Sequence, residues 1–324
     1  MVKLLFAGTP DVAVPSLREL AADSEHFEMV AVLTRPDAPQ GRGRKLMPSP
    51  VKQAAIDLGI PVIESDPSEP TFLDELAVTG AEAAAVVAYG RILKPRVLEA
   101  LPLGWYNLHF SLLPQWRGAA PVQRSIWSGD SITGATVFQI TEGMDEGPIL
   151  AQSTVTIGSH ETAGELLNRL AQDGSKLLAA SLQALEEGRI DKVEQPRGAF
   201  EVAEKIRVED AHIRFDVPVF AADRQIRACT PNPGAWCHLA LSPETGEDDQ
   251  LLLHILKAAP ADIEDSRTPQ ALSAGELKIG KNNVWVGTAT EALELLEVKA
   301  QGKKAMRAAD WARGARLPES AVLR

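Results

Sequence analysis

The chain has 324 residues, 45% of them hydrophobic and 24% charged, values that exclude a disordered, collagenous or low-complexity protein and fit two globular domains. Lys and Arg number 33 against 44 Asp and Glu, and the net charge of −11 argues against indiscriminate nucleic-acid binding. A nucleic-acid partner would therefore need local basic patches. The sequence shows neither an apolar run of membrane-spanning length nor a signal-peptide pattern, so we expect a cytoplasmic protein.

Up to about residue 156, short apolar runs rich in β-formers alternate with helical patterns. The predicted strands are 3–7, 29–34, 83–88, 106–109, 135–140 and 150–156, and the predicted helices are 12–22, 50–58, 119–128 and 162–187. Apolar strands separated by helices predict a mostly parallel sheet covered on both faces. Ligands of such sheets bind beyond the carboxyl ends of the strands. This α/β domain is expected to cover residues 1–188.

The remainder of the chain has a different texture. A charged stretch with Pro196 and Gly198 is interpreted as a linker over residues 189–207. Beyond it, short strands are predicted at 235–241, 251–257, 277–279, 284–286 and 292–298, separated by turn signals and without regular helices. This pattern predicts a smaller C-terminal β-barrel domain over 208–324, for which an OB-like barrel is one form.

The segment with the most chemistry is 107–118, Asn-Leu-His-Phe-Ser-Leu-Leu-Pro-Gln-Trp-Arg-Gly. Asn107 and His109 stand two apart at the end of a predicted strand, so both side chains point to the same face of the sheet. An amide beside a protonated imidazole can stabilise a developing oxyanion. Asp145, in a turn framed by two glycines after another strand, can reach the same cleft, keep His109 protonated and relay a proton.

Two other kinds of site are disfavoured by the sequence. The turn 6–10, Phe-Ala-Gly-Thr-Pro, lacks the second and third glycines of a dinucleotide-binding fingerprint. No His, Cys or acidic cluster has metal-ligand spacing, and the two cysteines, Cys229 and Cys237, make neither a zinc site nor a disulfide framework. We therefore expect chemistry without NAD, FAD or metal.

Asn107-x-His109 followed by Ser-Leu-Leu-Pro-x-x-Arg-Gly, with the downstream Asp145, is similar to the folate-dependent formyltransferases. The strings at 6–11, 41–52, 88–90, 118–124 and 302–306 resemble in particular the members of this family that act on methionyl initiator tRNA. The resemblance spans nearly the whole chain. It implies a Rossmann-like formyltransferase domain, an OB-like C-terminal domain that binds tRNA, and formyl transfer for translation initiation, with Asn107, His109 and Asp145 as the catalytic residues.

The resemblance also implies ligands and the residues that bind them. The one-carbon donor would be 10-formyltetrahydrofolate as a co-substrate, bordered by Ser111, Leu112, Leu113, Pro114, Ala88, Tyr89 and Gly90. Phe110 departs from the family pattern, in which a small residue is expected, and this ring could alter folate affinity. Arg42 would enter the acceptor-stem end of the tRNA. The other expected tRNA contacts are Arg44, Lys45, Lys303 and Lys304. The family also favours a monomer.

The distribution of charge is consistent with a tRNA partner. Residues 35–52 carry five basic residues against Asp37 alone, and residues 299–316 carry six against Asp310 alone. Two such patches on an acidic chain favour phosphate binding, although a charge run is often only a solvated face. Two alternatives remain open at this stage: a formyltransferase acting on a small amine, and a non-catalytic tRNA-binding module of the same fold.

Overall fold

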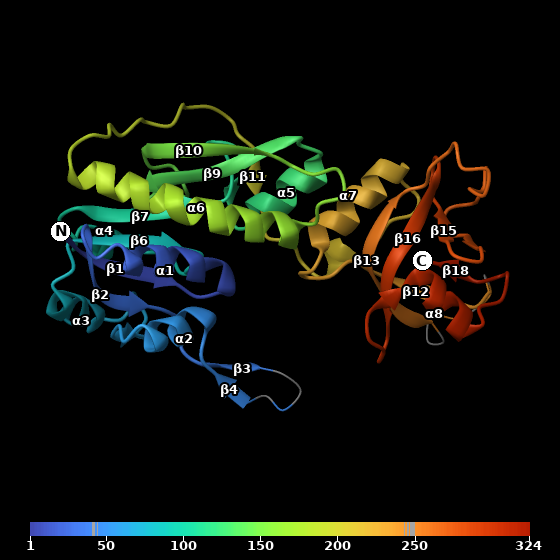
Figure 1. Cartoon of the computed structure of the whole chain (residues 1–324), viewed down its shortest axis with the longest axis horizontal. Helices are drawn as coiled ribbons and strands as arrows, with labels where there is room; N and C mark the ends of the chain where they lie inside the picture. Colours follow the sequence, from blue (N-terminus) through green and yellow to red (C-terminus); the bar gives the residue numbers. More distant parts are fainter. Residues whose placement is uncertain (41–42, 44, 243, 245, 247–249) are drawn as a thin grey trace. The chain divides into compact units, whose positions relative to one another are not determined.

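The structure is a computed structural model that describes residues 1–324 except 41–42, 44, 243, 245 and 247–249. The chain divides into two compact units (Figure 1). Unit 1 holds Met1–Pro121, Ile132–Thr156 and Leu167–Ala203, and unit 2 holds Val122–Ser131, Ile157–Leu166 and Glu204–Arg324.

The core of unit 1 is a sheet of strand order β10-β9-β7-β6-β1-β2-β5. The strands are β1 (Val2–Gly8), β2 (Phe27–Leu33), β5 (Val62–Ile63), β6 (Ala83–Val87), β7 (Gly104–His109), β9 (Ile132–Gln139) and β10 (Ile149–Thr156). Strands β5, β2, β1, β6 and β7 are parallel, whereas β9 pairs antiparallel with β7 and β10 antiparallel with β9. The predicted mostly parallel sheet is thus confirmed.

Helices cover both faces of this sheet. One face carries α3 (Phe72–Thr79) and α4 (Pro95–Leu98), neither of them predicted, whose Phe72, Leu76 and Val97 join a buried cluster with Leu5 and Trp105. On the other face Gly174 of α6 (Ala163–Glu186) lies against Leu108 of β7, and a Cβ at Gly174 would meet the leucine side chain at 3.0 Å. Unit 1 also holds η1 (Asp11–Ala13), α1 (Val14–Ala22) and α2 (Pro50–Asp57), whereas α5 (Pro121–Ser128) belongs almost entirely to unit 2.

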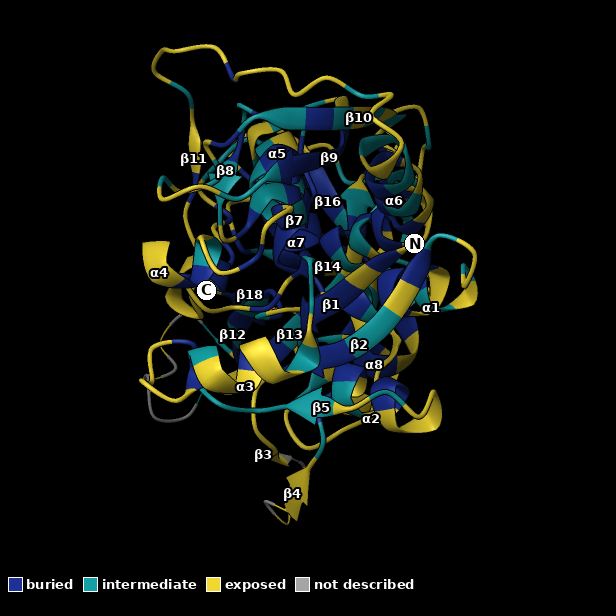
Figure 2. Ribbon diagram, turned by 90° about the vertical axis from the view of Figure 1, so that its left-hand side faces the viewer, coloured by how far each residue is buried: buried dark blue, intermediate teal, exposed yellow. Residues whose placement is uncertain are grey.

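A hairpin of β3 (Ala38–Gln40) and β4 (Lys45–Met47) leaves unit 1 between β2 and α2, and its β4 strand is exposed (Figure 2). Its base is fastened by a 2.8 Å hydrogen bond between the buried hydroxyls of Thr34 and Ser49. Ser49 also caps α2, because its side chain accepts from the backbone N–H of Lys52. The Lys52 ammonium pairs with Asp37 at 2.7 Å and Glu64 at 2.9 Å, so this lysine of the basic run 35–52 is neutralised within the protein.

Unit 2 is built around an antiparallel sheet of order β14-β15-β16-β13-β12-β18. Its strands are β12 (Trp236–Ala240), β13 (Leu251–Pro260), β14 (Leu277–Ile279), β15 (Val284–Gly287), β16 (Ala292–Ala300), β17 (Met306–Arg307) and β18 (Val322–Leu323). Glu276, beside β14, bridges Val322 of β18, so the two edges of the sheet meet and nearly close a barrel. The predicted barrel is confirmed.

The expectation that this region has no regular helices is wrong. Helix α7 (Val219–Cys229) and helix α8 (Ala308–Ala315) both pack against the barrel strands, and the short η2 (Glu209–Ala211) packs against α7. The last turns of α7 are buried on all sides, whereas α8 buries one side. In α7 the buried positions include polar groups, and Asp223 and Arg227 pair at 2.8 Å one turn apart. Such paired charges weaken the apolar periodicity on which the sequence-based assignment depends.

Candidate active site

Asn107 and His109 lie at the carboxyl end of β7, where the parallel part of the sheet meets the antiparallel β9. Alternation along the strand turns both away from Leu108, which packs under α6, and toward the same face of the sheet. Asn107 is half-buried, and His109 is 6% exposed. Asp145 follows β9 in the turn 142–147, and its carboxylate lies 3.8 Å from His109 Nδ1. Two chain segments far apart in sequence thus bring an imidazole and a carboxylate together.

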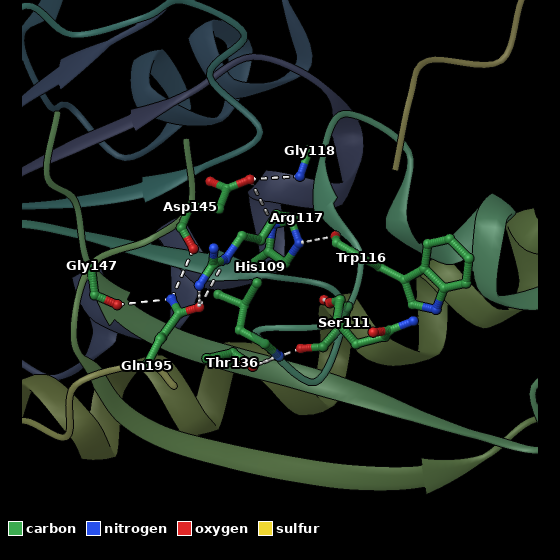
Figure 3. A network of polar contacts seen from close by, with 11 residues as sticks. His109, Ser111, Trp116, Arg117, Gly118, Thr136, Asp145, Gly147 and Gln195 are labelled. Atoms are coloured by element: carbon green, nitrogen blue, oxygen red, sulfur yellow. Dashed lines mark hydrogen bonds and ion pairs between the residues drawn. The ribbon is translucent and has the colours of Figure 1, made fainter. Parts of the chain in front are cut away.

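The protonation of His109 is set by two opposing effects. Its Nε2 lies 2.9 Å from the carbonyl oxygen of Trp116, and because a carbonyl only accepts, Nε2 carries the hydrogen (Figure 3). Nδ1 is then the nitrogen that gains or loses a proton. Burial lowers the pKa of His109, and this effect outweighs the Asp145 charge and the hydrogen bond to the Trp116 carbonyl, which both raise it. The lowered pKa opposes the expectation that Asp145 keeps His109 protonated, which stays a prediction.

Asp145 has a backbone conformation that residues other than glycine rarely adopt. Its φ is 52°, and its carboxylate Oδ2 accepts a 2.8 Å hydrogen bond from the backbone N–H of Gly118. Gly118 has φ 122°, and a Cβ there would come within 2.8 Å of the Ala203 carbonyl oxygen, so only glycine fits. Trp116 also has a positive φ, 60°. Strained backbone collected beside one imidazole is typical of a functional site.

The loop 111–114 is braced from strands β9 and β10. The Thr136 hydroxyl donates to the Ser111 carbonyl at 2.6 Å, and it accepts from the Leu113 N–H at 3.1 Å and from the Gln152 amide at 2.9 Å. Ser111 in turn donates its hydroxyl to the Gln115 carbonyl at 2.7 Å. One hydroxyl thus uses all three of its hydrogen-bonding positions to hold the loop.

Replacing Thr136 by Val should destabilise the protein by about 2 kcal/mol, because buried Leu113 N–H and Ser111 carbonyl groups would be left without their partner. The loop 111–114 should also loosen. Urea unfolding measures the first effect and hydrogen–deuterium exchange of the loop the second. Thr154→Val, on the exposed side of β10, is the matched control and should stay within about 0.5 kcal/mol of the parent. Equal stability of the two variants would contradict this account of Thr136.

The segment 88–90 follows β6 on the same edge of the sheet. Ala88 has φ 48° and Gly90 φ 78°, and both are exposed, whereas the Tyr89 ring between them is buried in the core. Nothing lies within 4 Å of the place where a Cβ of Gly90 would stand, so a ligand can approach the backbone there. The residues from this segment that can border a ligand are therefore Ala88, Gly90 and the backbone of Tyr89. Phe110 is 7% exposed, so its ring is largely buried.

The expected tRNA-contacting residues divide into two groups. Arg42 and Arg44 lie outside the described residues. Lys45 is exposed on β4, and Lys303 and Lys304 are exposed in the turn between β16 and β17, where Gly302 has φ 71°. Within the second basic run, Arg313 forms an ion pair with Asp310.

Sequence reasoning missed the residues that support the site from outside the motif, among them Thr136 and Gln195. Neither stands in a recognisable pattern, because a single side chain that bonds to a distant backbone leaves no periodic signal. Among the described residues, no group of three or more His, Cys, Asp and Glu side chains could hold a metal ion. Nor does any described helix have the length and apolarity to cross a membrane.

A neutral imidazole facing a carboxylate, with an amide two residues away, can move a proton and stabilise an oxyanion at the carboxyl end of a Rossmann-like sheet. These properties suit an enzyme that transfers a group with acid–base assistance. The chain belongs to the formyl transferase family: residues 2–182 match the family's "Formyl transferase" model and residues 205–316 its "Formyl transferase, C-terminal domain" model. The resemblance noted in the sequence is thereby confirmed.

Relatives that match over nearly their whole length indicate which members of the family the chain is most similar to. The chain is 74% identical over 317 residues to the methionyl-tRNA formyltransferase of Bifidobacterium adolescentis, covering 98% of each chain. It is 48% identical to the methionyl-tRNA formyltransferase of Streptomyces coelicolor, again over 98% of each. Among solved structures, the fold is similar to that of an N-formyltransferase from Helicobacter canadensis in complex with folinic acid and dTDP-3-aminofucose. That match has a TM-score of 0.63 and 19% identity and covers 91% of this chain and 99% of the other.

Proposed function

We propose that the protein transfers the formyl group of 10-formyltetrahydrofolate to the α-amino group of methionine esterified to initiator tRNA, giving N-formylmethionyl-tRNA for translation initiation. The observation that carries this proposal is the pairing of His109 with Asp145 beside Asn107 in a chain whose full-length relatives are methionyl-tRNA formyltransferases. The cytoplasm, where translation takes place, is the location that we propose, and we propose a monomer.

The reaction moves one carbon without a change in its oxidation level. The amine nitrogen attacks the formyl carbon, a C–N bond forms, and the bond from that carbon to N10 of the folate breaks. The attacking amine loses one proton and N10 gains one, so a group that accepts and returns a proton assists both steps. The intermediate carries a negative oxygen on the formyl carbon, which calls for a hydrogen-bond donor.

Each of the three residues then has a separate role. His109 Nδ1 accepts the proton of the attacking amine and returns it to N10, since Nε2–H is already committed to the Trp116 carbonyl. Asp145 stabilises the imidazolium that forms, from 3.8 Å away. The Asn107 amide, on the same strand face, donates to the oxyanion. Ser111, Leu112, Leu113 and Pro114, together with Ala88, Tyr89 and Gly90, border the folate.

The substrate tRNA binds through Arg42, Arg44, Lys45, Lys303 and Lys304. Residues 208–324 serve as the tRNA-binding domain, and residues 1–188 supply the catalytic domain. Changing Lys303 and Lys304 together to Gln should weaken tRNA binding and leave the KM for folate unaltered, because exposed lysines contribute to phosphate affinity through counterion release. The variant should also reduce the slope of log K against log salt by about 1.8. A parent-like slope would remove these lysines from the interface.

The test of the function compares three acceptors: charged initiator tRNA, charged elongator methionine tRNA and a small primary amine, each with 10-formyltetrahydrofolate. Transfer confined to the initiator supports the whole proposal. Transfer to the small amine alone would keep the roles of Asn107, His109 and Asp145 and discard those of the basic residues. Absence of any transfer would leave a tRNA-binding module as the better account.

A further inference from the structure

The segment after α6 buries one polar side chain. From residue 191 to 199, all of which the structure describes, eight residues are exposed and Gln195 alone is buried, with 9% of its surface accessible. Burying an amide costs free energy unless its donors and acceptor are satisfied. A buried glutamine among exposed neighbours therefore points to a specific set of partners.

The Gln195 amide has such partners on two sides (Figure 3). Its Nε2 donates to the carbonyl oxygens of Asp145 and Gly147, both at 2.8 Å. Its Oε1 accepts from Nε and Nη2 of Arg117, at 3.0 Å and 2.6 Å. Both hydrogens and both lone pairs of the amide are thus used.

These bonds connect the turn 142–147 with the loop 116–118, the two segments that position the Asp145 carboxylate. The carboxylate accepts from the N–H of Gly118, the neighbour of Arg117, and the carbonyl of the same aspartate accepts from Gln195. Asp145 is therefore held at its side chain and at its backbone, which maintains its φ of 52°. Gln195 fixes the distance between the turn 142–147 and the loop 116–118.

The rest of the segment supports the same loop. The Arg117 guanidinium lies over the Phe200 ring, with its Cζ 5.6 Å from the ring centroid. The Glu201 carbonyl accepts from the Trp116 N–H at 3.1 Å. β11 (Val202–Ala203) pairs with β8 (Arg117–Gly118), and the Ala203 carbonyl accepts from the N–H of Ala119 at 2.8 Å. The carbonyl that fixes the His109 tautomer belongs to this supported loop.

We infer that Gln195 is a positioning residue of the formyl-transfer site and that residues 193–203 are part of the active site, although the "Formyl transferase" match ends at residue 182. The inference rests on the proposed function, since it assigns Gln195 its effect through Asp145. Gln195 touches no reacting atom. It holds the carboxylate where it faces His109 Nδ1.

The test uses the full chain with Gln195→Leu, which keeps the bulk of the side chain and removes all four hydrogen bonds. The kcat for formyl transfer should fall about tenfold to a hundredfold, as small misplacements of catalytic groups do, with both KM values within about twofold of the parent. Gln195→Glu is the second variant: it is close in size, but it places oxygens against the Asp145 and Gly147 carbonyls, and it should lose a similar factor. Asp191→Asn, at an exposed residue of the same segment outside 193–203, is the control and should match the parent.

Hydrogen–deuterium exchange gives a readout that does not depend on the reaction. In Gln195→Leu, peptides covering 142–147 and 116–120 should exchange faster, while peptides of β1 and β6 should be unchanged. A parent-like kcat in both Gln195 variants, or a change in the KM for tRNA alone, would overturn the inference. If the parent itself transfers no formyl group, the proposed function fails, and faster exchange confined to the two loops would still support the positioning of Asp145 by Gln195.

Discussion

Changing Asp145 to Asn should lower the kcat for formyl transfer by about 10²–10⁴, the range expected for loss of assistance to proton transfer. Asparagine has the same shape, and its Oδ1 can still accept from the Gly118 N–H, so the turn should keep its conformation. What disappears is the negative charge 3.8 Å from His109 Nδ1. Without this charge, the imidazolium formed as the amine attacks is buried with no counter-ion, which is costly in a desolvated site.

Single-turnover measurements with saturating folate and tRNA isolate this effect, because binding is then complete before chemistry begins. The affinity for both substrates should stay within a few-fold of the parent. Glu146→Gln provides the matched control. Glu146 is next in the same turn, and its side chain is 58% exposed, with its Oε1 3.4 Å from Nη1 of Arg117. Turnover of Asp145→Asn within a few-fold of the parent would show that the carboxylate has no part in proton transfer.

How much of this architecture the sequence predicts depends on the range over which each feature is encoded. The strands around Leu5 and Ala85 are continuous apolar runs, and the helix after Ser49 begins with a cap and a proline, so local patterns suffice. Asn107 and His109 are two apart on one strand, and alternation places them on one face. The likeness to the formyltransferases then indicates that Asp145 belongs with them.

The missed features depend on contacts that the chain forms only when folded. Helix α4 has only 4 residues, and Phe72 of α3 and Val97 of α4 become buried only against the sheet. Gln195 stands in a charged stretch with proline and glycine on its carboxyl side, which indicates a linker, and nothing local reveals that the amide meets the turn of Asp145. The lowered pKa of His109 is hidden for a similar reason: the charge of Asp145 is visible in the sequence, but the extent of burial that lowers the pKa is not.

Replacing His109, whose pKa this burial lowers, is the second change for which we expect a large effect. Changing His109 to Gln should lower kcat by about 10²–10⁴, because an amide cannot accept the amine proton. Its pH dependence identifies the role. Burial places the pKa of His109 below its ordinary value of about 6.5, so the imidazole is neutral at pH 7 and Nδ1 is ready to accept a proton. As the pH falls through this lowered pKa, Nδ1 becomes protonated and kcat should fall.

The attacking amine must also be neutral, and α-amino groups have pKa values of about 7.7. A plot of log kcat against pH should therefore decline below the pKa of the amine and steepen below that of His109. In His109→Gln the first decline should remain and the steepening should vanish. If protonated His109 were instead the form needed to hold the oxyanion, kcat in the parent would fall as the pH rises through the His109 pKa, the opposite sign.

Stability gives an independent check on the direction of this pKa. Between the lowered pKa of folded His109 and about 6.5, the unfolded chain binds more protons than the folded one, so the free energy of unfolding rises with pH in that window. His109→Gln should flatten the rise. The variant could instead keep the parent's slope of unfolding free energy against pH and still lose the steepening in the kcat profile. That result would mean that the pKa of His109 is lowered only when substrate is bound.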